Sequence, residues 1–183
     1  MNKIRRIALC TLAATSLLFF SQVSGADDTF LKIDGIDGES KDSAHLGEID
    51  VLAWQWDYTI SEDAGRSGRA REATVCEPIS FVHYFDKASV GIALAGFTGS
   101  FIPEAVLTVR KSDEVQMEYL KITLRDAAVI SQNMGGEESE NRLIEQFLLS
   151  FERIKLEYTE QLPDGSGAAA IQFEWDCEAN RQL

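Results

Sequence analysis

The segment 48–58, EIDVLAWQWDY, constrains the fold more than any other part of this sequence. Two kinds of side chain alternate along it, which predicts a β-strand whose two faces meet different surroundings. Leu52, Trp54 and Trp56 are expected on one face, where side chains of this size would form a wall of the core. The opposite face is expected to carry the smaller or more polar residues Val51, Ala53, Gln55 and Asp57.

The rest of the chain contains many further strand patterns and little that predicts helix. Short runs bounded by turn residues predict strands at 29–33, 75–85, 105–111, 115–130 and 169–177. The alternation slips after Asp126, which indicates a β-bulge. One short helix is expected within 86–96, where Ser89 can cap the start and Gly96 can end it. Together these patterns predict a mainly β protein, built as a compact barrel or sandwich.

Segment 142–158 supports two interpretations. Ile144, Phe147 and Phe151 recur at helical spacing, so the first half fits an amphipathic helix. Residues 154–158 alternate and fit a strand. The residue pattern by itself therefore favours a helix followed by a strand.

Residues 61–74, SEDAGRSGRAREAT, are polar and have no apolar period. They predict a long exposed loop, and loops of this length inside a compact domain tend to be functional or disordered. Arg66, Arg69 and Arg71 would present positive charge from a very acidic protein, so the loop could contact an acidic patch on another subunit. A solvated, flexible loop without a partner is the other interpretation.

The first 26 residues have the three parts of a secretory signal peptide. Three basic residues near the start precede a predominantly apolar run, 7–20, and small residues then lead to Ala26. The apolar run is shorter than the roughly 18 residues expected of a membrane-spanning helix. Cleavage before Asp27 is therefore expected, rather than retention as a membrane anchor.

Cleavage would leave residues 27–183, a length suited to a single domain with a real hydrophobic core. The full chain has a net charge of −13, and the signal peptide contains three basic residues and no acidic one, so the mature chain carries −16. No dense basic cluster offsets this charge. Binding to nucleic acid or to an anionic membrane surface is therefore not expected.

Two cysteines, Cys76 and Cys177, remain after cleavage. In an oxidising compartment they could form a disulfide, and otherwise they would be two separate buried thiols. The sequence leaves both alternatives open, because it does not give the distance between the two residues.

No arrangement of residues typical of catalysis stands out, so neither an enzyme nor a cofactor is expected. His45 lies near Glu48 and Asp50, but a metal site there would lack a second histidine. His83, the other histidine, falls in an expected strand, where a structural role is expected. The sequence also contains no nucleophile elbow and no phosphate-binding loop.

Several short motifs occur in a fixed order along the chain. A strand at 29–33 is followed by GESKD at 38–42, His45 and EIDVLAWQW at 48–56. The later motifs are ISF at 79–81, DKAS at 86–89, LTVRK at 107–111, EYLKITL at 118–124 and FEW at 173–175. This ordered string resembles the haemolysin-coregulated protein (Hcp) family, whose members form the tube of type VI secretion systems. The resemblance covers most of the chain from about Asp28 onward.

The resemblance implies an Hcp-like two-sheet β-barrel with one short α-helix on the outside and a long extended loop, assembled as a hexameric ring. Such rings stack into a tube that is expelled with small effectors in its lumen. The implied partners are therefore further copies of this chain and the spike, sheath and effector proteins of the apparatus. The resemblance also implies strand throughout 142–158, and we follow it there.

Two regions gain expected roles from this resemblance. Gln55 becomes a candidate for the sheet face that lines the lumen, since it points away from the tryptophans. The loop that contains Arg66, Arg69 and Arg71 becomes a candidate for the contact between stacked rings.

Residues 1–26 depart from the family, whose tube proteins fold and polymerise in the cytoplasm without a cleavable signal. Either this chain is an exported paralogue, or its true start lies downstream, for example at Val23. Three signal-peptide regions in the correct order favour export. The alternative function is then that of an Hcp-like barrel exported by the Sec pathway, which acts as a periplasmic or extracellular binding protein. A disulfide between Cys76 and Cys177 would support this alternative.

Overall fold

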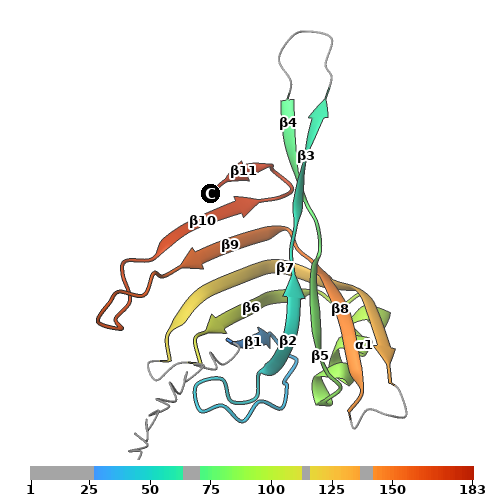
Figure 1. Ribbon diagram of the computed structural model, residues 1–183. Helices are drawn as coiled ribbons and strands as arrows, with labels where there is room; N and C mark the ends of the chain where they lie inside the picture. Colours follow the sequence, from blue (N-terminus) through green and yellow to red (C-terminus); the bar gives the residue numbers. More distant parts are fainter. Residues whose placement is uncertain (1–26, 64–70, 113–115, 137–141) are drawn as a thin grey trace, which may run out of the picture.

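The structure is a computed structural model that describes residues 27–63, 71–112, 116–136 and 142–183. The predicted signal peptide, residues 1–26, lies outside the described residues. The described parts form eleven strands and one helix (Figure 1). In chain order these are β1 (Asp28–Ile33), β2 (Ile49–Gln55), β3 (Tyr58–Asp63), β4 (Arg71–Cys76), β5 (Ile79–Tyr84), α1 (Lys87–Thr98), β6 (Ile102–Arg110), β7 (Glu118–Gly135), β8 (Ile144–Ser150), β9 (Arg153–Tyr158), β10 (Ile171–Asp176) and β11 (Arg181–Gln182).

Six strands close into a barrel. Neighbouring strands pair in the order β7, β6, β1, β2, β5, β8, and β8 pairs back with β7. All of these pairings are antiparallel. Each barrel strand therefore has a partner on both sides, which leaves the barrel without an open edge. The mainly β, barrel-type fold that the sequence predicts is confirmed.

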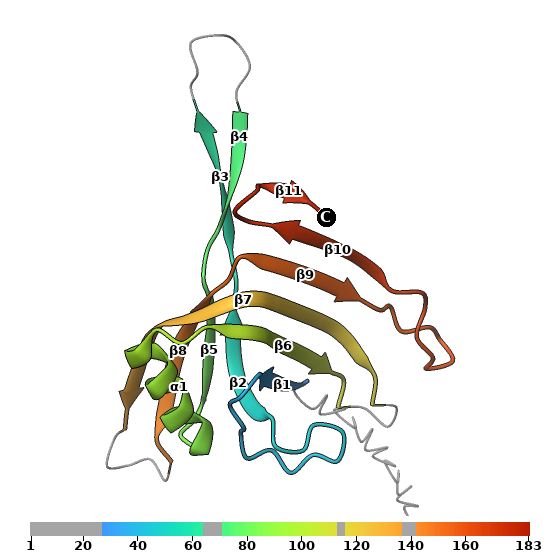
Figure 2. The ribbon, with the colours of Figure 1, turned by 180° about the vertical axis from the view of Figure 1, so that it is seen from behind.

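The long strand β7 belongs to two parts of the molecule. Its residues 120–125 pair with β9, whereas residues 128–135 pair with β8. The chain bends between them, where the sequence predicts a bulge: Asp126 has a φ of 56°, and the register with β8 shifts between Val129 and Ser131. Beyond β7 the sheet continues through β9, β10 and β11, and these three strands are called the flange (Figure 2).

The core fills the barrel and extends beneath α1. Phe81 and Phe147 lie at partner positions of β5 and β8, and their ring centroids are 5.3 Å apart. Burial of one such side chain contributes roughly 1.5–3 kcal/mol relative to exposure. The other large, fully buried apolar side chains are Leu31, Ile49, Ile79, Ile92, Leu107, Ile122, Leu124, Leu149 and Ile154.

Helix α1 begins and ends at residues other than those the sequence predicts. Asp86 is the N-cap, because its carboxylate accepts a hydrogen bond from the Ala88 N–H at 2.8 Å. The Ser89 hydroxyl accepts from the Asp86 N–H at 3.1 Å, so Ser89 completes a capping box and is not the cap itself. Gly96 lies inside the helix, and the chain leaves the helix at Gly99, whose φ of 64° suits glycine.

The predicted core wall on β2 is wrong at Leu52. Val51 points inward and is 9% exposed, whereas Leu52 is 47% exposed on the outer surface. A bulge between Val51 and Ala53 shifts the register with β5. This shift places Trp54 and Trp56 on the same side as Val51, where both indoles are half-buried and pack against the core. The inner face therefore contains a residue that strict alternation assigns to the outer face.

Segment 142–158 is strand on both sides of a short break, as the family resemblance implies. β8 pairs with β5 and β7, and β9 pairs with β7 and β10. The inward residues of β8 follow period 2, since Glu145, Phe147 and Leu149 are all buried. Glu145 is charged, so it conceals this alternation in the sequence. The residue pattern favours a helix in the first half of the segment, and that prediction is wrong.

Strands β3 and β4 form a two-stranded hairpin that projects away from the barrel (Figures 1 and 2). Their pairing starts with Tyr58 opposite Cys76 at the base of the hairpin. The predicted exposed loop 61–74 is therefore partly wrong, because 61–63 and 71–74 are strand. Residues 64–70 lie outside the described residues.

Candidate functional site

The outer face of β2, β5, β8 and the second half of β7 carries uncharged residues in its central rows. The strand registers define these rows, in which Gln55 lies opposite Ser80. Gln146 donates from Nε2 to the Ser80 hydroxyl at 2.7 Å and so links neighbouring rows. Gln55 itself is exposed on this surface, called the uncharged face. Its members are Ala53, Gln55, Ser80, Val82, Ser131, Asn133, Gln146 and Leu148.

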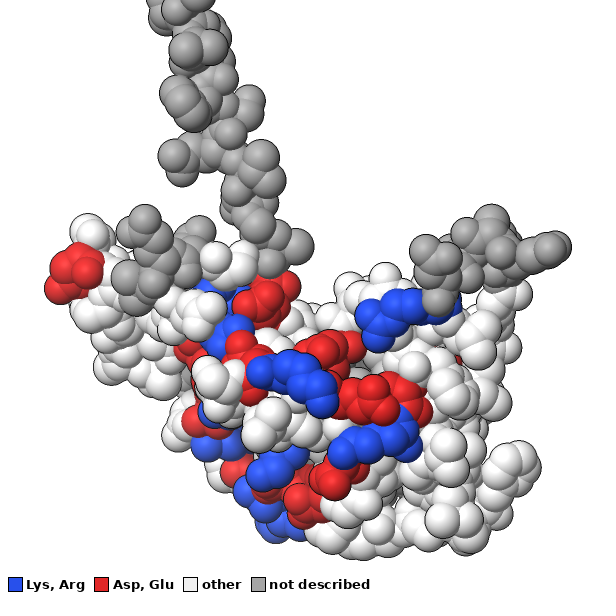
Figure 3. Space-filling model, turned by 90° about the horizontal axis from the view of Figure 1, so that it is seen from below, with Lys and Arg blue, Asp and Glu red and all other residues white. Residues whose placement is uncertain are grey.

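The outer face of β1, β6, β9 and the first half of β7 is rich in charge. It surrounds a depression of about 400 Å³. Basic and acidic side chains are interleaved on the underside of the molecule (Figure 3). Such partly exposed pairs each contribute little stability, roughly 0–1 kcal/mol. Three ion pairs on this face have N–O distances of 3.0–3.3 Å: Arg125–Glu104, Lys121–Glu118 and Lys155–Glu157.

The solvent side of α1 is apolar, which the sequence analysis missed. Val90, Leu94 and Phe97 are 66%, 64% and 93% exposed. Phe101, just beyond the helix, is also exposed. Exposed apolar patches of this kind mark contacts with other molecules. No face stands out in the sequence, because α1 is apolar almost all round and has Lys87 as its one charged residue.

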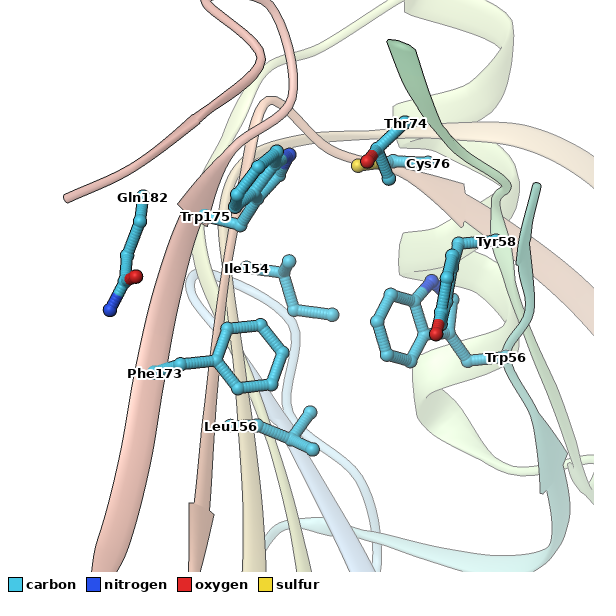
Figure 4. Close-up of a pocket in the computed structure, with 9 residues that line it drawn as sticks. All are labelled: Trp56, Tyr58, Thr74, Cys76, Ile154, Leu156, Phe173, Trp175 and Gln182. Atoms are coloured by element: carbon cyan, nitrogen blue, oxygen red, sulfur yellow. The ribbon is translucent and has the colours of Figure 1, made fainter. Parts of the chain in front are cut away.

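The base of the hairpin faces the flange across an apolar pocket of about 420 Å³ (Figure 4). Trp56 and Tyr58 lie on the hairpin side, and Phe173 and Trp175 of β10 lie on the flange side. The indole N–H groups of both tryptophans are buried and have no hydrogen-bond partner among the described residues. The pocket therefore combines aromatic walls with two unused donors.

Cys76 lies on the wall of this pocket and is bonded to Cys177, with an S–S distance of 2.05 Å and a Cα–Cα distance of 6.0 Å. Of the two alternatives that the sequence leaves open, the structure has the disulfide. The bond joins residues that are 101 positions apart in the chain. It connects the hairpin base to the end of β10.

The structure does not describe the side chains of the three arginines that the sequence proposes as a contact site on the hairpin. Arg66 and Arg69 lie outside the described residues. Arg71 begins β4 and pairs through its backbone with Asp63.

His45 packs loop 34–48 against the outer surface of β1. Its ring stacks on Phe30 at a centroid distance of 4.1 Å, and its Nδ1 lies 2.9 Å from Oε2 of Glu48. Within the described ranges no group of three or more His, Cys, Asp or Glu side chains could hold a metal ion. The arrangement gives His45 a structural role in holding the loop.

Arg110 also contacts Phe30 and holds the same loop. Its guanidinium lies 4.9 Å from the Phe30 ring centroid and donates to Asp28 at 2.9 Å and to Asp42 at 2.7 Å. The hydrogen bonds from Arg110 and from the Ala44 backbone lower the pKa of Asp42 to about 2. The pKa of Arg110 is raised in return, chiefly by its hydrogen bond to Asp42. The GESKD motif thus ends in a partly exposed ion-pair network around the buried Arg110.

The fold and these surfaces define a class of closed β-barrel proteins that carry a flange and a projecting hairpin. Residues 30–158 match the family described as "Type VI secretion system effector, Hcp". The chain belongs to this Hcp family. Among the described residues no helix is both long enough and apolar enough to cross a membrane.

Individual relatives match nearly the whole of their own length. Protein hcp1 of Pseudomonas aeruginosa is 38% identical over 160 residues, which cover 86% of this chain and 99% of that protein. The crystal structure of Hcp1 from Salmonella typhimurium matches with a TM-score of 0.70 and 34% identity, over 87% of this chain and 100% of that one. A type VI secretion system effector from Yersinia pestis matches with a TM-score of 0.64 and 32% identity, over 81% and 99%.

Proposed function

We propose that this protein is a tube-forming, secreted component of a type VI secretion system. Its subunits form hexameric rings that stack and carry effectors in the lumen. The observation that carries this proposal is the closed barrel with two unlike outer faces, in a chain related to Hcp proteins over their whole length. The partners are further copies of this chain and the spike, sheath and effector proteins of the apparatus.

The uncharged face is the proposed wall of the lumen, with Gln55 on its β2 border. A chain with a net charge of −13 would otherwise surround its cargo with negative potential, which would repel acidic effectors. Neutral amide and hydroxyl groups avoid this repulsion and still offer hydrogen bonds. In this arrangement the apolar side of α1 lies on the outer wall of the ring.

The hairpin is the proposed contact between stacked rings. It is the element that projects farthest from the barrel among the described parts (Figure 1). Arg66, Arg69 and Arg71 lie at or near its tip in the sequence and would meet acidic residues of the next ring.

Light scattering of chain 27–183 across a wide concentration range tests ring formation, and electron microscopy of the same samples tests its symmetry. We expect a six-subunit particle with a central hole. A monomer at every concentration would overturn the proposal. Reversal of the three hairpin arginines to glutamate should abolish stacking and leave single rings intact, whereas Lys41→Glu in the exposed part of loop 34–48 should leave both unchanged.

Gln55→Arg tests the lumen wall. Six added positive charges in the lumen should change which effectors co-purify with the ring and should leave the ring itself intact. Gln172→Arg is the matched control, because Gln172 is exposed on β10 and lies outside the uncharged face. Equal effector recovery with both variants would contradict the assignment of Gln55.

Two observations favour a second function, that of a Sec-exported, Hcp-like binding protein of the periplasm or medium. The first 26 residues have the pattern of a signal peptide, and Cys76 and Cys177 are bonded to each other. The intact mass of the native protein distinguishes the routes. A chain that begins at Asp27 supports Sec export, whereas a chain that begins near Val23 supports assembly in the cytoplasm.

A further inference from the structure

The β3–β4 hairpin has little support from the barrel. It is a two-stranded sheet of its own, and an isolated hairpin of this kind is only marginally stable in water. The ladder between β2 and β5 ends with Gln55 opposite Ser80. Pro78 lies directly before β5, where the ladder would continue, and it has no backbone N–H to donate. The hairpin therefore needs attachments at its base to hold a fixed direction.

Those attachments lead to the flange. Cys76, at the end of β4, is bonded to Cys177, directly after β10. The Thr74 N–H donates to Oδ1 of Asn180 at 3.3 Å, in the turn that joins β10 to β11. A covalent bond and a hydrogen bond thus connect the hairpin base to one short stretch of the flange.

The disulfide lies beside a pocket and not in the sealed core. Neither Cys76 nor Cys177 is fully buried, and Cys76 lines the open pocket between the hairpin and the flange (Figure 4). Access of an attacking thiolate to a disulfide sulfur is a condition for exchange. This disulfide borders the pocket and does not lie in the sealed core, so the pocket provides the route for an attacking thiolate.

We propose that the Cys76–Cys177 bond is a redox-operated latch, which fixes the hairpin against the flange in an oxidising compartment and releases it under reducing conditions. The latch does not depend on ring formation. It goes beyond the proposed function, because it makes the direction of the hairpin depend on the redox state of the surroundings.

The chemistry of closure balances with an external disulfide as oxidant, either a protein or a small molecule. One cysteine thiolate attacks that disulfide, forms a mixed disulfide and releases one external thiol. The second cysteine thiolate then attacks the sulfur of its partner in the mixed disulfide and expels the second external thiol. The two cysteines lose two protons and two electrons, and the oxidant gains both. A dithiol reductant runs the same steps in reverse.

Hydrogen–deuterium exchange of chain 27–183, oxidised or reduced with a phosphine, tests the latch. On reduction we expect amides of β3, β4 and the β10–β11 turn to exchange at least ~10-fold faster, while those of β1 and β6 change much less. An unchanged hairpin, or the same acceleration throughout the barrel, would overturn the proposal. Fluorescence provides a second readout, because Trp56 and Trp175 line the pocket beside the disulfide.

Two variants sharpen this test. Cys76→Ser with Cys177→Ser should reproduce the reduced state without reductant and should not respond to the phosphine. Asn180→Ala removes the hydrogen bond but keeps the disulfide, so hairpin exchange should rise by less than ~5-fold. If Asn180→Ala released the hairpin fully, the disulfide would not be the latch. Should the double variant fail to fold, the reduced natural chain still decides the question.

Light scattering on the same samples separates this inference from the proposed function. A protein that is monomeric in both redox states, but whose hairpin responds to reduction, would overturn ring formation and support the latch. Rings whose hairpin amides exchange at the same rate in both redox states would support ring formation and overturn the latch.

Discussion

Nε2 of His83 lies 2.7 Å from Oε1 of Glu145, and both side chains are completely buried. The two residues occupy partner positions of β5 and β8 inside the barrel. Gln132 of β7 donates from Nε2 to the other carboxylate oxygen at 3.2 Å and to the Ser89 carbonyl of α1 at 3.0 Å. A polar network therefore joins three barrel strands to the helix within an otherwise apolar core.

Loss of the Glu145 carboxylate should be costly. Glu145→Ala leaves His83 and Gln132 without their buried partner, which should lower the free energy of unfolding by about 2–5 kcal/mol. Urea unfolding of the isolated chain measures this change. Glu178→Ala, in the exposed turn after β10, is the control and should stay within about 0.5 kcal/mol of the natural chain. Equal stability of the two variants would contradict a structural role for the network.

The Asp42–Arg110 pair should give the protein an acid limit. The pKa of Asp42 is about 2 in the folded chain against an ordinary value of 3.8, so the unfolded chain binds the proton first. The stabilisation is therefore present above about pH 4 and is lost as the pH falls towards 2. We expect Asp42→Asn to lower the urea midpoint at neutral pH and to flatten its fall below pH 4.

Asp37→Asn is the control for the acid limit, because Asp37 is exposed and its ion pair, with Lys87, is 3.9 Å long. Its acid profile should follow that of the natural chain. If Asp42→Asn gave the same profile as Asp37→Asn, the Arg110 contact would contribute nothing to acid stability.

Gly38 should tolerate no side chain. A Cβ atom there would overlap the Glu48 carbonyl and approach the Ile49 Cα to 2.7 Å, and both obstacles are backbone. Gly38→Ala should therefore cost roughly 1–3 kcal/mol or more, measured as a drop in melting temperature. Gly135→Ala is the matched control, since nothing lies within 4 Å of its added Cβ. A neutral Gly38→Ala would show that the loop can move away from β2.

Tyr119 should ionise late in an alkaline titration. Burial and the hydrogen bond that its hydroxyl donates to Asp27 at 2.7 Å raise the pKa of Tyr119 to about 12. Because this folded pKa lies above the ordinary value of 10, the stabilisation is complete below pH 10 and is lost as the pH rises towards 12. Phenolate absorbance follows the titration. Tyr119→Phe should remove the late component, and Tyr84→Phe should leave it in place.

Much of the barrel could be predicted from alternation, because a strand with one face on the core imposes period 2 on its residues. The exceptions have physical causes. A bulge in β2 brings Val51 to the core together with the tryptophans. In β8 a buried Glu145 interrupts the apolar row. The hairpin strands stand clear of the core, so no apolar period marks 61–63 or 71–74.

The candidate surfaces were predictable to different degrees. The outward direction of Gln55 follows from its position between two tryptophans, and the structure has it exposed. The apolar side of α1 could not be recognised, because the buried side is apolar too. The bond between Cys76 and Cys177 needed the distance between two strands far apart in sequence, which no local pattern contains.

The strand order also determines when the barrel can close during folding. β1 pairs with β2 but also with β6, where Asp28 lies opposite Arg110, and the barrel closes only when β8 pairs with β7. Folds dominated by contacts between distant residues form slowly. During synthesis the barrel therefore cannot close until the chain has grown past Ser150. A translocation channel that accepts only unfolded chains would have most of the synthesis time in which to engage this one.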